Sequence, residues 1–384
     1  MRQPTALVAA GLAFTFALTG CGSSPADGPA TGATASSTTT AQGSLPKGFF
    51  GVVAPELYPA TDADLNQALD AQAKAGVGLL RQSFLWQYVE PEPGTFDYAK
   101  YDRLVGAAAQ RGIAILPIIF GVSPGEGAKA KPGAKVTDTT TMPPLHDAHF
   151  AAYAVRLVQR YGPDGAFWKD HPKIPKLPIT SWQVWNEPNL KAYWGGTPDA
   201  TAYGKLLKTT AKAIRGADPK AQIVTAGLPN SKLGGSLSTY VRTMIKRAGT
   251  GSFDVLAVHP YAQSAADVLA SAKQTEQVAE AAGAGDIGLW ITEVGWATDA
   301  PSSPFTVGET QQAQLVGDLL RQSADQATAL RLRGVVYYAW RDAPVYEGGT
   351  DFWGLHTGLV KRDNAVKPSL TTFADTIKAI RSGG

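Results

Sequence analysis

Short apolar runs, rich in β-branched and aromatic residues, alternate with longer amphipathic stretches along most of the chain. Runs of this length and composition predict β-strands. The eight runs are GFFGVVA from Gly48, LLRQSF from Leu79, IAILPIIF from Ile113, SWQVWNE from Ser181, QIVTAG from Gln222, FDVLAVHP from Phe253, IGLWITE from Ile287 and GVVYYAW from Gly334. Because longer stretches separate them, the pattern favours a parallel sheet covered by helices.

The stretches between the runs follow the helical period. In DADLNQALDAQAKA, residues such as Leu65 and Leu69 contribute to a mostly apolar face. Asp62, just before the apolar residues begin, is expected to cap this helix. The stretch HFAAYAVRLVQRYG has the same kind of periodicity. Strands and helices are therefore expected to alternate.

Eight strand-helix units in roughly 340 residues fall within the size range of one (β/α)8 barrel. The competing arrangement, two doubly wound domains, has less support because no Gly-rich phosphate loop follows the first run. We expect an α/β protein with a single (β/α)8 TIM barrel over residues 47–384. The segments Gly121 to Asp147 and Arg341 to Lys367 are expected as insertions at the carboxyl ends of strands, where such barrels carry their active sites.

The first 46 residues do not follow this pattern. Residues 1–20 combine Arg2, an apolar core from Ala6 to Leu18 and small residues before Cys21, which is the layout of a secretory signal. The segment LTGC resembles the lipobox of bacterial lipoproteins, whose cysteine is acylated. Cys21 is the only cysteine, so it has no disulfide partner within the chain. Lipidation is favoured over an uncleaved anchor or a chance cysteine, because the apolar stretch is shorter than the roughly 20 residues of a spanning helix.

Residues 21–46 consist mainly of Gly, Ser, Thr, Ala and Pro. Such a segment buries too little apolar surface to offset its chain entropy, so a disordered tether is expected. The protein is therefore expected to be exported. It would be lipid-anchored through Cys21 at the outer face of the cytoplasmic membrane, or secreted, and only the anchor would contact the membrane.

Composition and charge narrow the choice of partners. Of 384 residues, 44% are hydrophobic and 17% are charged, which allows a large core. The formal net charge is +3, and acids and bases are scattered along the sequence, so no nucleic-acid partner is expected. No His, Cys and Asp cluster has metal-ligand spacing, so neither a catalytic metal nor another cofactor is expected. The oligomeric state stays open.

The ends of the predicted strands carry polar and aromatic residues that suit one chemistry. They are Arg81, Asn186, Glu187, His259, Tyr261, Glu293 and Trp340. Two facing carboxylates suit acetal cleavage, in which one carboxyl protonates the leaving oxygen and the other attacks the anomeric carbon. Glu187 follows the aromatic run SWQVW. A partly dry environment disfavours its ionisation and would keep it protonated as the acid.

These segments resemble the catalytic segments of the glycoside hydrolase clan A barrels, which include families 5 and 39. WNEPN at residues 185–189 and ITEVGW at residues 291–296 are similar to their fourth-strand and seventh-strand segments. The similarity extends to RQSFLWQYVEPEPGTFDYAKYDRLV and FWGLHTGLVKRDNAVKPSL, and so covers nearly all of residues 48–380. The resemblance implies a retaining glycosidase that cleaves an extracellular poly- or oligosaccharide by double displacement.

Carried over by position, the resemblance makes Glu187 the acid/base and Glu293 the nucleophile. Asn186 would hydrogen-bond the 2-hydroxyl of the sugar, and Arg81 would keep Glu293 ionised. An ordinary structural ion pair stays open for Arg81.

The other substrate-binding candidates lie nearby. His259 and Tyr261 would stand beside the two glutamates, although a structural role for His259 is equally open. Trp340 would stack under the apolar face of the sugar, and Trp296 lies on a strand-end loop where it can form a further platform. Core packing is the alternative for both tryptophans.

Two other functions are compatible with the same residues. A carbohydrate-binding lipoprotein would have kept the barrel and lost turnover, but the presence of Glu187, Glu293, Asn186 and Arg81 weighs against it. A transglycosylase would pass the glycosyl group to another sugar. The sequence identifies neither the sugar nor the linkage.

Overall fold

The structure is a computed structural model that describes residues 45–127, 141–231, 235–345 and 349–383. The predicted signal, Cys21 and all but the last two residues of the predicted tether lie outside the described residues. Parts of both predicted insertions also lie outside them. Within the described ranges, no helix is both long enough and apolar enough to cross a membrane.

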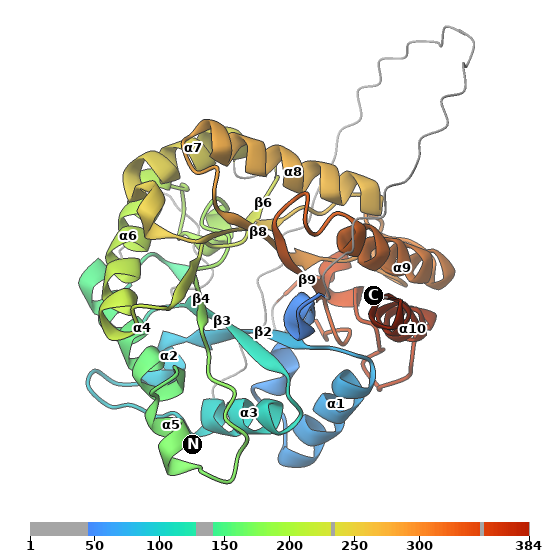
Figure 1. Ribbon diagram of the computed structural model, residues 1–384, viewed down its shortest axis with the longest axis horizontal. Helices are drawn as coiled ribbons and strands as arrows, with labels where there is room; N and C mark the ends of the chain where they lie inside the picture. Colours follow the sequence, from blue (N-terminus) through green and yellow to red (C-terminus); the bar gives the residue numbers. More distant parts are fainter. Residues whose placement is uncertain (1–44, 128–140, 232–234, 346–348, 384) are drawn as a thin grey trace, which may run out of the picture.

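The described strands form one closed parallel sheet at the centre of the molecule (Figure 1). Their bounds are β1 Phe50–Val53, β2 Leu79–Leu85, β3 Ala114–Phe120, β4 Ser181–Val184, β5 Gln222–Val224, β6 Leu228–Pro229, β7 Val255–His259, β8 Gly288–Val294 and β9 Leu332–Tyr338. The strand order is β5-β4-β3-β2-β1-β9-β8-β7-β6, and the sheet closes because β5 and β6 both pair with β7. Together, β5 and β6 occupy one of the eight strand positions of the barrel. The predicted single (β/α)8 barrel is confirmed, and the two-domain alternative is wrong.

Helices surround the sheet in chain order, as the colours of Figure 1 show. Their bounds are α1 Asp62–Lys74, α2 Trp86–Val89, α3 Ala99–Gln110, α4 Asp147–Tyr161, α5 Ala166–Asp170, α6 Ala200–Ala217, α7 Leu237–Ala248, α8 Ala265–Ala281, α9 Glu309–Asp325 and α10 Pro368–Ser382. The cap predicted at Asp62 is wrong by one residue. The side chain of Thr61 caps α1 by accepting the backbone N–H of Asp64.

Apolar side chains fill two layers, one inside the barrel and one between the sheet and the helices. The inner layer contains Val53, Leu79, Leu116, Val224, Val255, Ala257, Trp290 and Val336. Most strands supply both layers, because successive side chains of a strand point to opposite faces. Arg81, two residues after Leu79 on β2, therefore points into the barrel interior.

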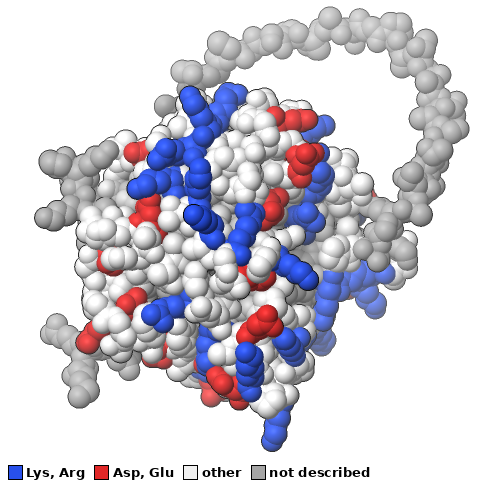
Figure 2. Space-filling model, turned by 60° about the vertical axis from the view of Figure 1, so that its left-hand side comes forward, with Lys and Arg blue, Asp and Glu red and all other residues white. Residues whose placement is uncertain are grey.

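Basic residues are concentrated on one side of the helical layer. α6 and α7 pack against each other and contain no acidic residue. Their basic residues are Lys205, Lys208, Lys212, Arg215, Arg242, Lys246 and Arg247. Figure 2 brings this side forward and shows Lys and Arg side chains gathered on it. The two helices follow one another in the chain and lie side by side in the fold, so their basic residues gather on this side.

Candidate active site

Glu187 and Glu293 face each other at the mouth of the barrel, the edge where the carboxyl ends of the strands meet. Oxygens of the two carboxylates lie within 4.8 Å of each other. Carboxyl groups about 5–5.5 Å apart allow one of them to attack the sugar directly, whereas separations of about 6.5–9.5 Å leave room for an intervening water. The separation in this structure suits direct attack.

An irregular backbone brings Asn186 and Glu187 to the site. The expected strand SWQVWNE ends at Glu187, but β4 ends at Val184, so Glu187 lies in the loop that follows the strand. Trp185 and Glu187 have φ values of 73° and 45°, in the left-handed region that side-chain-bearing residues rarely adopt. In a regular strand, neighbouring side chains would point to opposite faces. Here both Asn186 and Glu187 contact residues of the barrel mouth.

A strand irregularity brings Glu293 to the same place. On β8, Trp290 packs inside the barrel, while Leu289, Ile291 and Val294 pack in the outer layer. Strict alternation would place Glu293 outside together with Leu289 and Ile291. The register with β9 shifts between Ile291 and Val294, as in a β-bulge. The extra residue allows Glu293 to point inward.

Arg81 connects the residues around the two glutamates. Its side chain is fully buried, and its three donor groups reach three acceptors. Nε donates to Gln183 Oε1 at 2.7 Å, Nη1 to Glu293 Oε1 at 2.5 Å and Nη2 to Asn186 Oδ1 at 2.8 Å. Because Asn186 accepts through Oδ1, its NH₂ group is left to donate to a ligand. Arg81 is the third residue of β2 and reaches the mouth through the length of its side chain.

His259 and Glu187 form a close pair. His259 Nδ1 lies 2.6 Å from Glu187 Oε1 and 3.5 Å from Glu293 Oε2. Burial, reinforced by the charge of Arg81, lowers the pKa of His259 well below its ordinary value, so the ring is neutral. A Cβ atom at Gly227 would overlap this ring, so only glycine leaves room for it.

The surroundings of Glu187 favour its protonated form. Burial, and after it the negative charge of Glu293, raise the pKa of Glu187 well above its ordinary value, and the charge of Arg81 opposes them only in part. The site therefore favours a protonated Glu187 over a wider pH range than water does. A carboxyl that acts as a general acid needs this property.

Tyr261 supplies a second donor to Glu293. Its hydroxyl donates to Glu293 Oε2 at 3.0 Å. Burial, followed by the charge of Glu293, raises the pKa of Tyr261 well above its ordinary value, so the hydroxyl keeps its proton. The tyrosine ring packs against Trp353 at a centroid distance of 5.1 Å. Glu293 thus accepts through both oxygens, one from Arg81 and the other from Tyr261, as an ionised carboxylate can.

The predicted tryptophan platforms differ in their surroundings. Trp296 is fully buried, and its indole N–H donates to the Ala262 carbonyl at 2.8 Å. Both observations agree with the core-packing alternative, and the role of Trp296 as a substrate contact stays a prediction. Trp340, just beyond β9, is 2% exposed, and its stacking role stays a prediction. Trp353 is buried with an indole N–H that has no partner among the described residues.

The sequence reasoning missed Glu56, in the 3-10 helix Pro55–Leu57 just after β1. One of its carboxylate oxygens is buried without a partner in the described part of the chain. Burial raises the pKa of Glu56 to about 7, against a backbone hydrogen bond and the charge of Arg341. Burial, followed by the charges of Glu293, Glu187 and Glu56, raises the pKa of Tyr338 at the end of β9. Glu56 is thus close enough to act on the same tyrosine as the two glutamates of the barrel mouth. The sequence signal that could have identified Glu56 is its position just after the first predicted strand.

Glu187, His259 and Glu293 are also close enough together to contact one cation. However, Arg81 already places a positive charge 2.5 Å from Glu293. Such a charge repels a metal ion in a weakly solvated site. The arrangement therefore favours proton transfer and sugar binding over metal binding.

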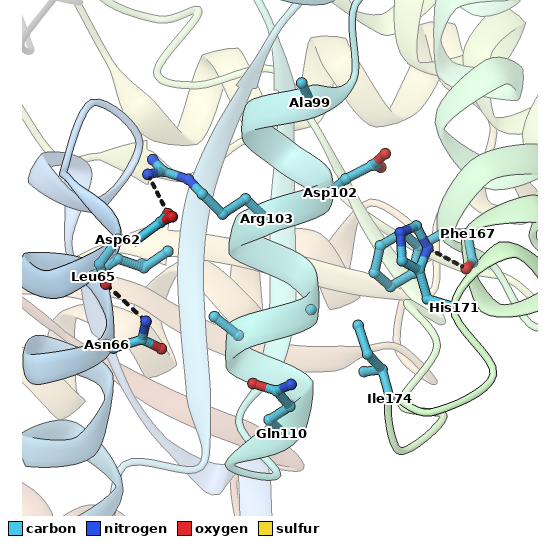
Figure 3. Close-up of a pocket in the computed structure, with 12 residues that line it drawn as sticks. Asp62, Leu65, Asn66, Ala99, Asp102, Arg103, Gln110, Phe167, His171 and Ile174 are labelled. Atoms are coloured by element: carbon cyan, nitrogen blue, oxygen red, sulfur yellow. Dashed lines mark hydrogen bonds and ion pairs between the residues drawn. The ribbon is translucent and has the colours of Figure 1, made fainter.

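A surface hollow of about 420 Å³ lies apart from these residues, in the helical layer. Figure 3 shows residues of α1, α3 and the segment 167–174 around it, including the ion pair of Arg103 with Asp62. None of the predicted site residues lines this hollow. The residues with catalytic chemistry gather at the barrel mouth instead.

No protein-family model matches the chain, and no curated protein matches its sequence. Among solved structures, a family 39 glycoside hydrolase from Bacteroides cellulosilyticus WH2 matches with a TM-score of 0.60 and 18% identity, covering 88% of this chain and 65% of that chain. A family 39 β-xylosidase from Caulobacter crescentus gives 0.61 and 18%, covering 87% and 72%. A family 1 β-glucosidase from Thermotoga maritima gives 0.60 and 14%, covering 88% and 99%. The chain thus spans just under two thirds of the first of these. At such identities the likeness establishes the barrel fold alone.

Proposed function

We propose that the protein is a retaining glycoside hydrolase that cleaves O-glycosidic bonds of an extracellular poly- or oligosaccharide. Glu187 is the acid/base and Glu293 is the nucleophile. The observation that carries this proposal is the pair of carboxyls within 4.8 Å, in which burial favours the protonated form of Glu187 while Glu293 is ion-paired with Arg81. Two carboxyls in such different surroundings suit the acid and nucleophile roles of a double displacement.

In the first step, Glu187 donates its proton to the glycosidic oxygen while an oxygen of Glu293 attacks the anomeric carbon. The bond to the leaving group breaks, and an ester links the sugar to Glu293. The NH₂ group of Asn186 donates to the sugar 2-hydroxyl, and this bond strengthens as positive charge develops at the anomeric carbon. Trp340 stacks under the apolar face of the sugar.

In the second step, water attacks the anomeric carbon and Glu187 removes its proton. Esterification removes the negative charge of Glu293, which is one cause of the raised pKa of Glu187. The pKa of Glu187 therefore falls in the intermediate, and the residue that acted as an acid becomes a base. Release of Glu293 restores the original charges.

Two of the structural neighbours are named as a β-xylosidase and a β-glucosidase. Their names support a carbohydrate substrate and make aryl β-glycosides the first substrates to screen. We also propose that acylated Cys21 anchors the enzyme at the outer face of the cytoplasmic membrane. Metabolic labelling with a fatty-acid analogue tests this, because Cys21→Ala should abolish incorporation and release the protein from membranes.

Trapping of the glycosyl-enzyme tests the nucleophile. An activated 2-deoxy-2-fluoro glycoside should slow the second step and leave one fluoroglycosyl group on the peptide that contains Glu293, as seen by mass spectrometry. Glu293→Gln should remain unlabelled. A label on another residue of an active enzyme would refute the nucleophile assignment, and product analysis at high acceptor concentration separates hydrolysis from transfer to a second sugar.

The leaving group tests the acid. Glu187→Ala should slow cleavage of glycosides with poor leaving groups by about 10²–10⁴-fold and partly spare activated aryl glycosides. Glu92→Ala, at an exposed residue after β2, is the matched control and should leave both rates unchanged. Equal losses on both substrate types in Glu187→Ala would contradict the acid role.

A further inference from the structure

A second group of histidines and a carboxylate lies at the start of α4, on residues that the proposed hydrolase does not use. His146 Nδ1 lies 3.2 Å from Glu126 Oε2, and His149 Nδ1 lies 2.8 Å from Glu126 Oε1. The three ligand atoms are all within 4.8 Å of one another. The imidazole rings lie side by side, with centroids 4.7 Å apart. Three metal-ligating side chains therefore converge on one point.

The backbone holds this arrangement on both sides. Glu126 N–H donates to the Ser123 carbonyl, and Leu145 N–H donates to the Glu126 carbonyl. Gly127 and Pro144 form an antiparallel bridge. His146 immediately precedes α4 and His149 lies in its first turn, so the spacing of three residues places both rings on one side of the helix. Local structure thus holds the backbone positions of the three residues.

The chemistry of these ligands matches zinc. Imidazole nitrogens and a carboxylate oxygen are ordinary zinc ligands, with bonds of about 2.0–2.2 Å. A tetrahedral ion at that distance keeps neighbouring ligand atoms roughly 3.3 Å apart. The observed contacts of 3.2 and 2.8 Å need only a small opening to reach this geometry. Side-chain exposures of 55% for His146 and 58% for His149 leave a fourth position to water.

We propose that Glu126, His146 and His149 bind one zinc ion or a similar divalent transition metal. The ion would join the segment after β3 to the amino-terminal end of α4, at the rim of the barrel mouth. This site is separate from the cluster of Glu187, His259 and Glu293, and the ion takes no part in the proposed hydrolysis.

Zinc titration of the full chain tests the site. After removal of metals by a chelator, calorimetry at about pH 7.5 should show one zinc per molecule with a Kd of about 10 µM or tighter. His149→Gln and Glu126→Gln should each weaken binding at least about tenfold. His356→Gln is the matched control, because His356 contacts one carboxylate, Asp351, at 2.7 Å without belonging to a three-ligand group of the described residues. This variant should bind zinc as the parent does.

Cobalt provides a second measurement that does not depend on the variants. Substitution with Co²⁺ should give the intense visible bands of a four-coordinate ion with nitrogen and oxygen ligands, and zinc should remove them. Failure of the stripped parent chain to bind zinc would overturn the proposal, because the contacts would then be histidine-carboxylate ion pairs only. Binding that is equally strong in His149→Gln and Glu126→Gln would also overturn it.

Discussion

Replacement of Arg81 by lysine tests whether one buried side chain holds the site together. Arg81 donates to Gln183 and Asn186, in β4 and just after it, and to Glu293 in β8. A lysine keeps the positive charge but lacks the planar set of donors, so at least two of these bonds are lost. Hydrogen bonds to charged groups contribute about 1.5–3 kcal/mol, and a buried acceptor without a partner costs about 1–3 kcal/mol. We expect the free energy of unfolding to fall by about 3–5 kcal/mol.

Urea denaturation followed by fluorescence measures this loss. The midpoint should decrease in Arg81→Lys while the m value stays constant. Arg321→Lys is the control, because Arg321 pairs with Asp318 on an exposed face of α9 and should change stability by no more than about 0.5 kcal/mol. The kcat/KM of Arg81→Lys should also fall by at least about 100-fold, since Glu293 and Asn186 lose their common partner. A variant as stable and active as Arg321→Lys would refute the network.

Three further predictions concern protonation and packing. Glu187→Gln should be more stable than the parent, by a margin that grows above about pH 5, because the folded carboxyl keeps a proton that the unfolded one loses near 4.5. A difference in melting temperature that does not change with pH would contradict this. Glu56→Gln should behave in the same way, with a gain of up to about 3 kcal/mol between its unfolded pKa of 4.5 and its folded pKa of about 7, measured by urea denaturation at both ends of that range. Gly227→Ala should displace His259, cost about 1–3 kcal/mol and alter the pH profile of kcat/KM, whereas Gly216→Ala in α6, which has no neighbour within 4 Å, should cost nothing. An unchanged pH profile in Gly227→Ala would show that the ring does not tune Glu187.

The barrel could be predicted because each of its parallel strands is buried on both faces and therefore reads as an apolar run. The break of the fifth position into β5 and β6 could not be predicted from QIVTAG. There the Thr225 hydroxyl accepts the backbone N–H of Ala257, and the Tyr203 hydroxyl accepts that of Ala226. Side chains thus replace the regular bonds of the sheet, and one of them comes from a helix. A local pattern does not contain such partners.

The residues of the site were more accessible to prediction than their surroundings. The segments WNEPN and ITEVGW identified Glu187 and Glu293 by resemblance. Trp296 was assigned to the sugar because it lies on a strand-end loop, whereas its hydrogen bond to the Ala262 carbonyl is a contact that only the fold shows. Glu56 was missed because one acid after a strand has no distinctive pattern. Its raised pKa arises from burial, which only the fold determines.

The alternation of side chains along a strand does not predict that both Glu187 and Glu293 point into the barrel mouth, because the backbone is irregular at both residues. A period of two would turn Glu293 to the outer layer, and regular β4 geometry would turn Asn186 and Glu187 to opposite faces. The register shift on β8 and the left-handed φ of Glu187 correct both directions. Such backbone irregularities cost energy and persist only where the surrounding structure holds them. Their presence at both members of the carboxylate pair is therefore an argument, independent of any motif, that this pair is the functional centre of the barrel.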